Sequence, residues 1–170
     1  MFPDVEGLRP TLGRSREALF NWLRPMLPEA KCLDLFAGSG ALGIEAASNG
    51  ASYVTFVEQQ RQVADCLKSS LEKLGLQDQS TLTVGDGITV LGQFSEPFDV
   101  IFVDPPFAAN ELLKQTLELI VERGLLGQWL YLEHDQTQQT SVEALLTELK
   151  LSIHRSTKAG TTCSLLLGHL

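Results

Sequence analysis

The sequence predicts an α/β protein with a mostly parallel, seven-stranded sheet, one antiparallel strand, and helices on both faces. Short apolar runs typical of buried strands alternate with longer segments of helical periodicity. The first run, Cys32 to Phe36, leads through a glycine-rich turn into a helix, as in nucleotide-binding sheets. The last two strand-like segments have no helix between them, so they should pair as a hairpin.

The N-terminal part is predicted to be helical. Pro10 biases Arg9 away from helix, and Thr11 is a suitable N-cap for a helix that ends near Leu23. We expect about residues 7–28 to form a helical extension ahead of the first strand. Residues 1–170 then form one domain, because the chain is long enough for one core and contains no repeat or linker.

The remaining elements follow from periodicity and from helix-stop residues. Asn49-Gly50 and Gly75 should end the second and third helices. We expect helices over about residues 11–23, 41–48, 61–74, 88–92, 111–122 and 142–149. We expect strands over about residues 32–36, 51–57, 80–84, 98–103, 129–133, 151–155 and 162–167.

Composition narrows the class of protein. No run of about 18 apolar residues exists, so we expect no membrane span. The N-terminus lacks the basic-then-apolar pattern of a signal peptide, and the three cysteines are scattered, which indicates a reducing cytoplasm. The three histidines show no ligand spacing either, so no metal site is expected.

The charge is uneven along the chain. A formal net charge of -8 argues against a nucleic-acid partner in general. Four arginines nevertheless fall close together near the N-terminus: Arg9, Arg14, Arg16 and Arg24. A weaker basic group lies near the C-terminus: Lys150, His154, Arg155 and Lys158. Either group could be an ordinary solvated surface or a phosphate-binding one.

The glycine-rich turn alone leaves the ligand open. Gly38, Gly40 and Gly43 match G-x-G-x-x-G, and Glu58 lies about 20 residues further on, as in nicotinamide-binding proteins. A dehydrogenase, however, has no use for the later sequence Asp104 to Phe107, and no acid or base for hydride transfer stands out. If the ligand is not a dinucleotide, Gly43 should serve helix packing rather than ligand contact.

Acidic residues follow four strands in succession. Asp34, Glu58, Asp86 and Asp104 should converge, because the carboxyl ends of parallel strands share one edge of the sheet. Glu58 could accept two hydrogen bonds from a ribose diol, and Asp86 one from an adenine amine. So many carboxylates would repel a pyrophosphate but attract the sulfonium and ammonium groups of S-adenosylmethionine.

The turn Asp104 to Phe107 reads Asp-Pro-Pro-Phe. The prolines stiffen it and remove two N–H donors, leaving the Asp104 carboxylate and the Pro105 carbonyl as acceptors. Phe107 adds an aromatic face. An exocyclic amine on a flipped-out base needs two acceptors and a stacking surface. The alternative, a rigid turn with Phe107 in the core, does not account for the other strand-end acids.

Together these motifs resemble a known family. Asp34 to Gly40 with Asp104 to Phe107 resembles class I S-adenosylmethionine-dependent amino-methyltransferases, whose fold is Rossmann-like. Arg9 to Thr11, Arg16 to Leu23 and Gly40 to Ala46 resemble the bacterial RsmD family more closely. That family methylates the N2 amine of a guanine in 16S ribosomal RNA, which implies as partner the small ribosomal subunit or an assembly intermediate. We expect a monomer.

The resemblance implies a role for each matching position. The implied catalytic residues, which would hold the target guanine, are Asp104, Pro105 and Phe107. The implied cofactor-binding residues are Asp34, Phe36, Ala37, Gly38, Gly40, Glu58, Asp86, Gly87 and Asp104. The implied RNA-binding residues are Arg9, Thr11, Arg14, Arg16 and Phe107. A DNA amino-methyltransferase and a non-catalytic ribosome-assembly factor remain alternatives.

Overall fold

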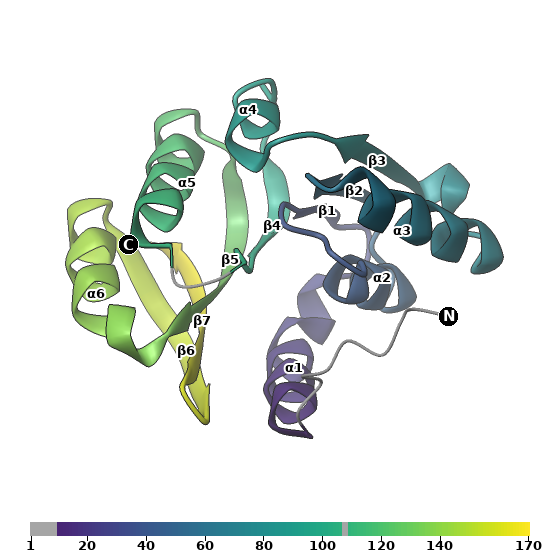
Figure 1. Ribbon diagram of the computed structural model, residues 1–170. Coiled ribbons are helices and arrows are strands. Elements are labelled where there is room, and N and C mark those ends of the chain that lie inside the picture. Colours follow the sequence, from purple (N-terminus) through teal and green to yellow (C-terminus); the bar gives the residue numbers. More distant parts are fainter. Residues whose placement is uncertain (1–9, 107–108) are drawn as a thin grey trace.

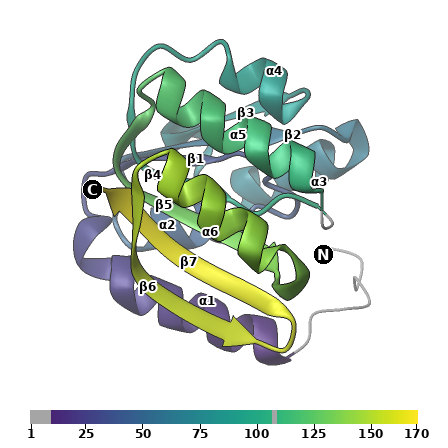
Figure 2. The same ribbon diagram turned by 90° about the vertical axis from the view of Figure 1, so that its left-hand side faces the viewer.

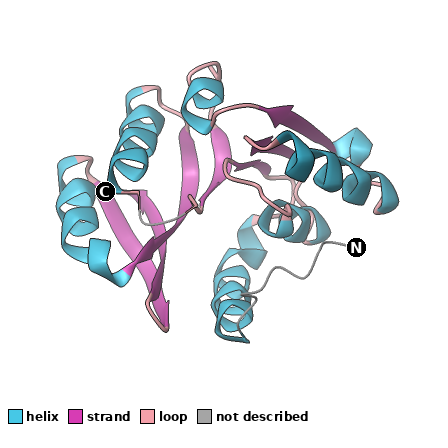
Figure 3. Ribbon diagram, in the orientation of Figure 1, coloured by secondary structure: helices cyan, strands magenta, loops and turns pink. Residues whose placement is uncertain are grey.

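The computed structural model describes residues 10–106 and 109–170, with side chains from residue 17 onward. Its strands form one sheet in the order β3-β2-β1-β4-β5-β7-β6 (Figures 1 and 3). The strands are β1 (Lys31–Asp34), β2 (Tyr53–Glu58), β3 (Ser80–Val84), β4 (Phe98–Val103), β5 (Leu126–Asp135), β6 (Leu151–Ala159) and β7 (Thr162–His169). The helices are α1 (Pro10–Leu23), α2 (Ala41–Ser48), α3 (Arg61–Lys73), α4 (Gly87–Leu91), α5 (Asn110–Glu122) and α6 (Gln139–Glu148).

The predicted topology is confirmed. Strand β7 is antiparallel to both neighbours, β5 and β6, and the other strand pairs are parallel. Strand β1 lies between β2 and β4, so the strand order reverses there. Open α/β sheets bind ligands beside such a reversal, at the carboxyl ends of the strands.

Each face of the sheet has its own apolar core, and residues alternate between the two along a strand. In β4, Ile101 and Val103 pack with α4, α5 and α6, whereas Val100 and Phe102 pack with α1, α2 and α3. This period of two is what a strand buried on both faces requires. Figure 2 shows α5 and α6 covering one face, while α1 runs along the other beside β6.

Element boundaries differ from the predicted ones at several places. Strand β1 ends at Asp34, two residues before the predicted end, and α6 begins three residues earlier than predicted. Helix α1 begins at Pro10, so Thr11 lies in its first turn and is not the cap predicted for it; the fixed φ of proline suits a first helical position. Strands β5, β6 and β7 are longer than the apolar runs that marked them. Pairing carries them beyond these runs: β6 and β7 pair from Leu151↔His169 to Ala159↔Thr162, and β5 pairs with β4 at Leu126 and with β7 as far as Asp135. Most of β6 is exposed, so polar residues are tolerated there.

Candidate active site

The turn after β1 brings the backbone to the carboxyl edge of the sheet. Gly38 and Gly40 have φ values of 55° and 79°, which favour glycine. The Ala37 N–H donates to the Val57 carbonyl at 2.9 Å, and the Gly40 N–H donates to the Ala37 carbonyl at 2.8 Å. The turn is therefore fixed against β2, and α2 starts immediately after it.

Asp34 secures the same turn from below. Its carboxylate is 2% exposed, and Oδ2 accepts a hydrogen bond from the Gly43 N–H at 3.0 Å. A carboxylate at the first turn of a helix satisfies an otherwise unpaired donor. Asp34, Ala37 and Gly40 shape the turn from behind and do not line the cavity above it, so direct ligand contact by these three stays a prediction.

A cavity of about 340 Å³, here called the first cavity, opens above the turn. It is lined by Leu35, Phe36, Gly38, Val57, Glu58, Gln59, Gln60, Val63, Gly85, Asp86, Gly87, Asp104, Pro105, Pro106 and Leu112. Six of the predicted cofactor-binding residues thus meet around one space: Phe36, Gly38, Glu58, Asp86, Gly87 and Asp104. No sequence motif predicted that Gln59, Gln60, Val63 and Leu112 would also line this cavity.

Glu58 organises this cavity as well as lining it. Its Oε2 accepts from the Gly38 N–H at 2.8 Å, and Oε1 accepts from the Gln60 N–H at 2.9 Å. One carboxylate thereby joins the glycine turn to the end of β2. Each oxygen has further acceptor capacity, because an ionised carboxylate offers about four lone-pair positions.

Asp86 caps α4 and faces the first cavity. Both the N–H and the hydroxyl of Thr89 donate to Oδ2 at 2.9 Å. The other oxygen, Oδ1, has no hydrogen-bond partner among residues 10–106 and 109–170. Beside it, a Cβ on Gly87 would lie 3.0 Å from the ring of Phe36. The absence of a side chain at Gly87 lets Phe36 form the floor of the cavity.

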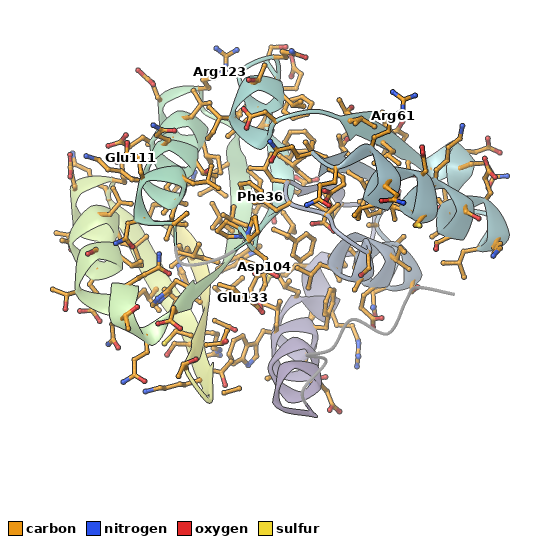
Figure 4. The ribbon with its side chains drawn as sticks, viewed as in Figure 1. Phe36, Arg61, Asp104, Glu111, Arg123 and Glu133 are labelled. Carbon is orange, nitrogen blue, oxygen red and sulfur yellow. The ribbon has the colours of Figure 1, made fainter. Side chains whose placement is uncertain are left out.

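Asp104 and Pro105 line a second cavity as well, of about 200 Å³. Its other lining residues are Glu133, His134, Asp135, Gln138 and Thr162. Figure 4 shows Phe36, Asp104 and Glu133 gathered at the centre of the molecule, where β1, β4 and β5 end. The turn at Asp104 therefore separates two adjoining spaces.

Glu133 belongs to a hydrogen-bonded group that the sequence did not indicate. The buried Tyr131 hydroxyl donates to Glu133 Oε1 and lies 3.3 Å from Ser164 Oγ. Burial, and next the charge of Glu133, raise the pKa of Tyr131 far above its usual value. Tyr131 thus keeps its proton and remains a donor to the carboxylate.

The side chains of the predicted RNA-binding residues lie outside the described part of the structure. Arg9 and Phe107 lie outside the described residues. Thr11, Arg14 and Arg16 lie in α1, but their side chains lie outside the description.

Among the described residues, no group of three or more histidine, cysteine or acidic side chains could hold a metal ion. None of the helices in the described part is long and apolar enough to cross a membrane.

Two relatives of similar sequence share the name ribosomal RNA small subunit methyltransferase D. Ribosomal RNA small subunit methyltransferase D of Escherichia coli is 43% identical over 125 residues, which cover 74% of this chain and 62% of the relative. The protein of the same name from Buchnera aphidicola of Acyrthosiphon pisum is 32% identical, covering 89% and 80% of the respective chains. The chain thus spans less than two thirds of the length of the Escherichia coli relative.

Solved structures agree with these relatives. The yhhF structure from Escherichia coli has a TM-score of 0.83 and 36% identity, covering 98% of this chain and 89% of that one. Magnesium protoporphyrin IX methyltransferase from Synechocystis, solved with bound SAM, has a TM-score of 0.74 at 18% identity, covering 94% and 80%. The latter shows the fold alone, that of a class I methyltransferase.

The family model described as conserved hypothetical protein 95 matches residues 1–167, nearly the whole chain. Together with the relatives named methyltransferase D, it confirms the resemblance found in the motifs. The chain belongs to the conserved hypothetical protein 95 family, the RsmD family of methyltransferases.

Proposed function

We propose that this protein transfers a methyl group from S-adenosylmethionine to the exocyclic N2 of a guanine in 16S ribosomal RNA. The observation that carries the proposal is the pair of cavities that share Asp104 and Pro105 as a common wall. A methyl donor and a methyl acceptor must meet across one short distance, and a shared wall of hydrogen-bond acceptors is where they can do so.

The first cavity suits S-adenosylmethionine. A Cβ on Gly38 would meet no atom within 4 Å, so the glycine leaves open space beside a backbone that a ligand can approach. Glu58 would accept the ribose hydroxyls, and Oδ1 of Asp86 would accept the adenine amine. The lining carboxylates favour the ligand's positive groups. The ligand supplies a methyl group on a positively charged sulfur.

The second cavity would receive the guanine. The Asp104 carboxylate and the Pro105 carbonyl would accept the two N–H groups of N2, turning its lone pair toward the methyl group. They would also stabilise positive charge as it develops on nitrogen. The N–C bond forms as the S–C bond breaks, and the surplus proton leaves N2 along its hydrogen bond to Asp104. Phe107, the predicted stacking residue, follows this wall directly in the sequence.

RNA contacts would come from the two basic groups. Helix α1, which carries Arg14 and Arg16, runs beside β6, which carries the exposed Arg155 and Lys158 (Figure 2). Groups far apart in the sequence thus lie on neighbouring elements. A local basic surface would attract phosphates despite the net charge of -8, and binding should weaken as salt rises. We place the reaction in the cytoplasm, with a monomeric enzyme acting on the small subunit or its precursor.

One experiment separates this proposal from its rivals. The protein is incubated with methyl-labelled S-adenosylmethionine and free 16S RNA, small subunits lacking the modification, or DNA, and the products are digested and identified. We expect label in N2-methylguanine from ribosomal substrates. Methyl-adenine or methyl-cytosine in DNA would establish a DNA enzyme. Binding to the subunit with no label in any nucleotide would establish an assembly factor.

A further inference from the structure

We propose that Glu133 is the residue that selects guanine, by accepting a hydrogen bond from the N1–H of the target base. The inference rests on the proposed function and extends it from the reacting amine to the base that carries it. Its basis is a further carboxylate in the second cavity, which lies on the strand next to Asp104.

The sheet register places the two carboxylates side by side. Strands β4 and β5 are parallel neighbours, and Val103 pairs with Leu132. Asp104 follows Val103 directly after β4 ends, and Glu133 follows Leu132 within β5. Neighbouring strands lie about 4.8 Å apart, which is a suitable spacing for acceptors that bind adjacent atoms of one base edge. Both residues line the second cavity, and Figure 4 shows them close together.

A hydrogen bond from Tyr131 fixes the orientation of the Glu133 carboxylate. The Tyr131 hydroxyl donates to Oε1, and within residues 10–106 and 109–170 the second oxygen, Oε2, has no hydrogen-bond partner. Tyr131 is fully buried against Phe102, so the donor cannot easily move. Since the pKa of Tyr131 is raised by burial, the hydroxyl does not lose this proton at physiological pH. One oxygen is thereby fixed, and the other keeps its acceptor capacity in a residue that lines the cavity.

Guanine is the base that matches three acceptors in a row. Its Watson–Crick edge carries N1–H next to the two N–H groups of N2, and a flipped base is read along that edge. Asp104 and Pro105 serve N2, which leaves Glu133 for N1–H. Adenine and cytosine carry a ring-nitrogen lone pair beside their amine. That lone pair would face the Glu133 carboxylate and be repelled by it.

The test uses an RNA in which the methylated guanine, once mapped, is replaced by 2-aminopurine. This base keeps the exocyclic amine but has a lone pair in place of N1–H. Initial rates at subsaturating RNA compare the two substrates for the wild type, Glu133→Gln, Tyr131→Phe and Glu143→Gln. Glu143, exposed on α6 and outside both cavities, is the matched control. Circular dichroism and cofactor affinity verify the fold of each variant.

We expect the wild type and Glu143→Gln to prefer guanine by at least about 100-fold, since a site built for an N–H rejects the analogue that lacks it. In Glu133→Gln the amide can place its NH₂ toward the base, so the preference should fall below about 10-fold. Tyr131→Phe should reduce it by a smaller factor. A folding defect lowers both rates together and leaves their ratio unchanged.

Two results would overturn the inference, and they differ from each other. If Glu133→Gln keeps the wild-type preference, or if the wild type does not discriminate, Glu133 does not read N1–H although guanine methylation stands. If the wild type methylates no guanine in any ribosomal substrate, the proposed function fails and this inference fails with it. Should Glu133→Gln not fold, an unchanged ratio in Tyr131→Phe would count against the inference.

Discussion

The two cavities that meet at Asp104 are built in different ways. The first is formed largely by the turns that follow β1, β2, β3 and β4, and the carboxylates of Glu58, Asp86 and Asp104 lie at these strand ends. Beyond the shared wall, the second is formed by β5, the segment after it, and the start of β7, and each of its residues there carries a polar side chain: Glu133, His134, Asp135, Gln138 and Thr162. Glu58 is fixed by two backbone N–H groups, whereas Glu133 is fixed by the Tyr131 side chain.

This difference matches what each cavity would bind. A ligand common to many enzymes can be held by turns, because backbone donors and strand ends recur wherever the fold recurs. A particular base must be distinguished by side chains, because only they differ between proteins that share a fold. We therefore expect changes in the first cavity to alter cofactor affinity, and changes in the second to alter methyl transfer and the choice of base.

The largest expected effect is at the shared wall. Asp104→Ala should lower the rate of methyl transfer by about 10²–10³-fold or more, because in the proposed mechanism it removes the acceptor that orients N2 and stabilises its developing charge. Cofactor affinity should change little, since Glu58, Asp86 and the glycine turn remain. Single-turnover rates with labelled cofactor measure the first quantity and calorimetry the second.

The control for this change is Asp78→Ala, which removes an exposed carboxylate that lines neither cavity. It should match the wild type in both measurements. Wild-type turnover in Asp104→Ala would remove Asp104 from the transfer step. An equal loss of turnover and cofactor affinity would mean that the two cavities do not act separately.

A smaller effect is expected in the first cavity. Glu58→Ala should weaken cofactor binding about 10- to 100-fold, because hydrogen bonds to a charged group contribute roughly 1.5–3 kcal/mol. The substitution removes the acceptor of the Gly38 N–H in the glycine turn. It also removes the acceptor proposed for the ribose hydroxyls. At saturating cofactor, the transfer rate and the preference for guanine should stay within a few-fold of the wild type.

Glu122→Ala is the matched control, an exposed glutamate at the end of α5. Calorimetry with S-adenosylmethionine should give it the wild-type dissociation constant. The same constant for Glu58→Ala would exclude Glu58 from the ligand site and reduce it to a support for the turn.

Sequence patterns predicted that residues of the first cavity would converge, because each of these residues closely follows a strand that the sequence itself marks. Strand-end acids and glycines are adjacent to apolar runs, so one rule about parallel strands brings Glu58, Asp86 and Asp104 together. Helix boundaries near these turns were also predicted closely, since α2 covers the expected residues. What the pattern did not show is that Asp34 faces α2 and that Glu58 already binds the turn.

Apart from Asp104 and Pro105, nothing local in the sequence marks the second cavity. Glu133 lies within β5, which is longer than its apolar run. The residue opposite Glu133 on the neighbouring strand β7 is Ser164. The neighbour relation between Glu133 and Asp104 depends on the register of β4 against β5. Register follows from how strands of differing length pack against both cores, and a single sequence does not give it.

The smallest effect on ligand binding is expected where the turn continues into α2. A Cβ on Gly43 would lie 2.3 Å from Cε1 of Phe56 and 3.0 Å from Cγ1 of Val54, both buried. This agrees with a packing role for Gly43. Gly43→Ala should reduce the free energy of unfolding by about 1–3 kcal/mol, with a fall in the thermal midpoint of roughly 2–4 °C per kcal/mol.

Gly38→Ala is the informative contrast. Its Cβ would meet no protein atom, but Gly38 lines the first cavity at a positive φ. We expect Gly38→Ala to weaken S-adenosylmethionine binding at least several-fold, and Gly43→Ala to leave the dissociation constant within about two-fold, both measured well below the thermal midpoint. The opposite order would mean that the ligand contacts the helix start at Gly43 rather than the turn, which would favour the phosphate-binding geometry of a dinucleotide site.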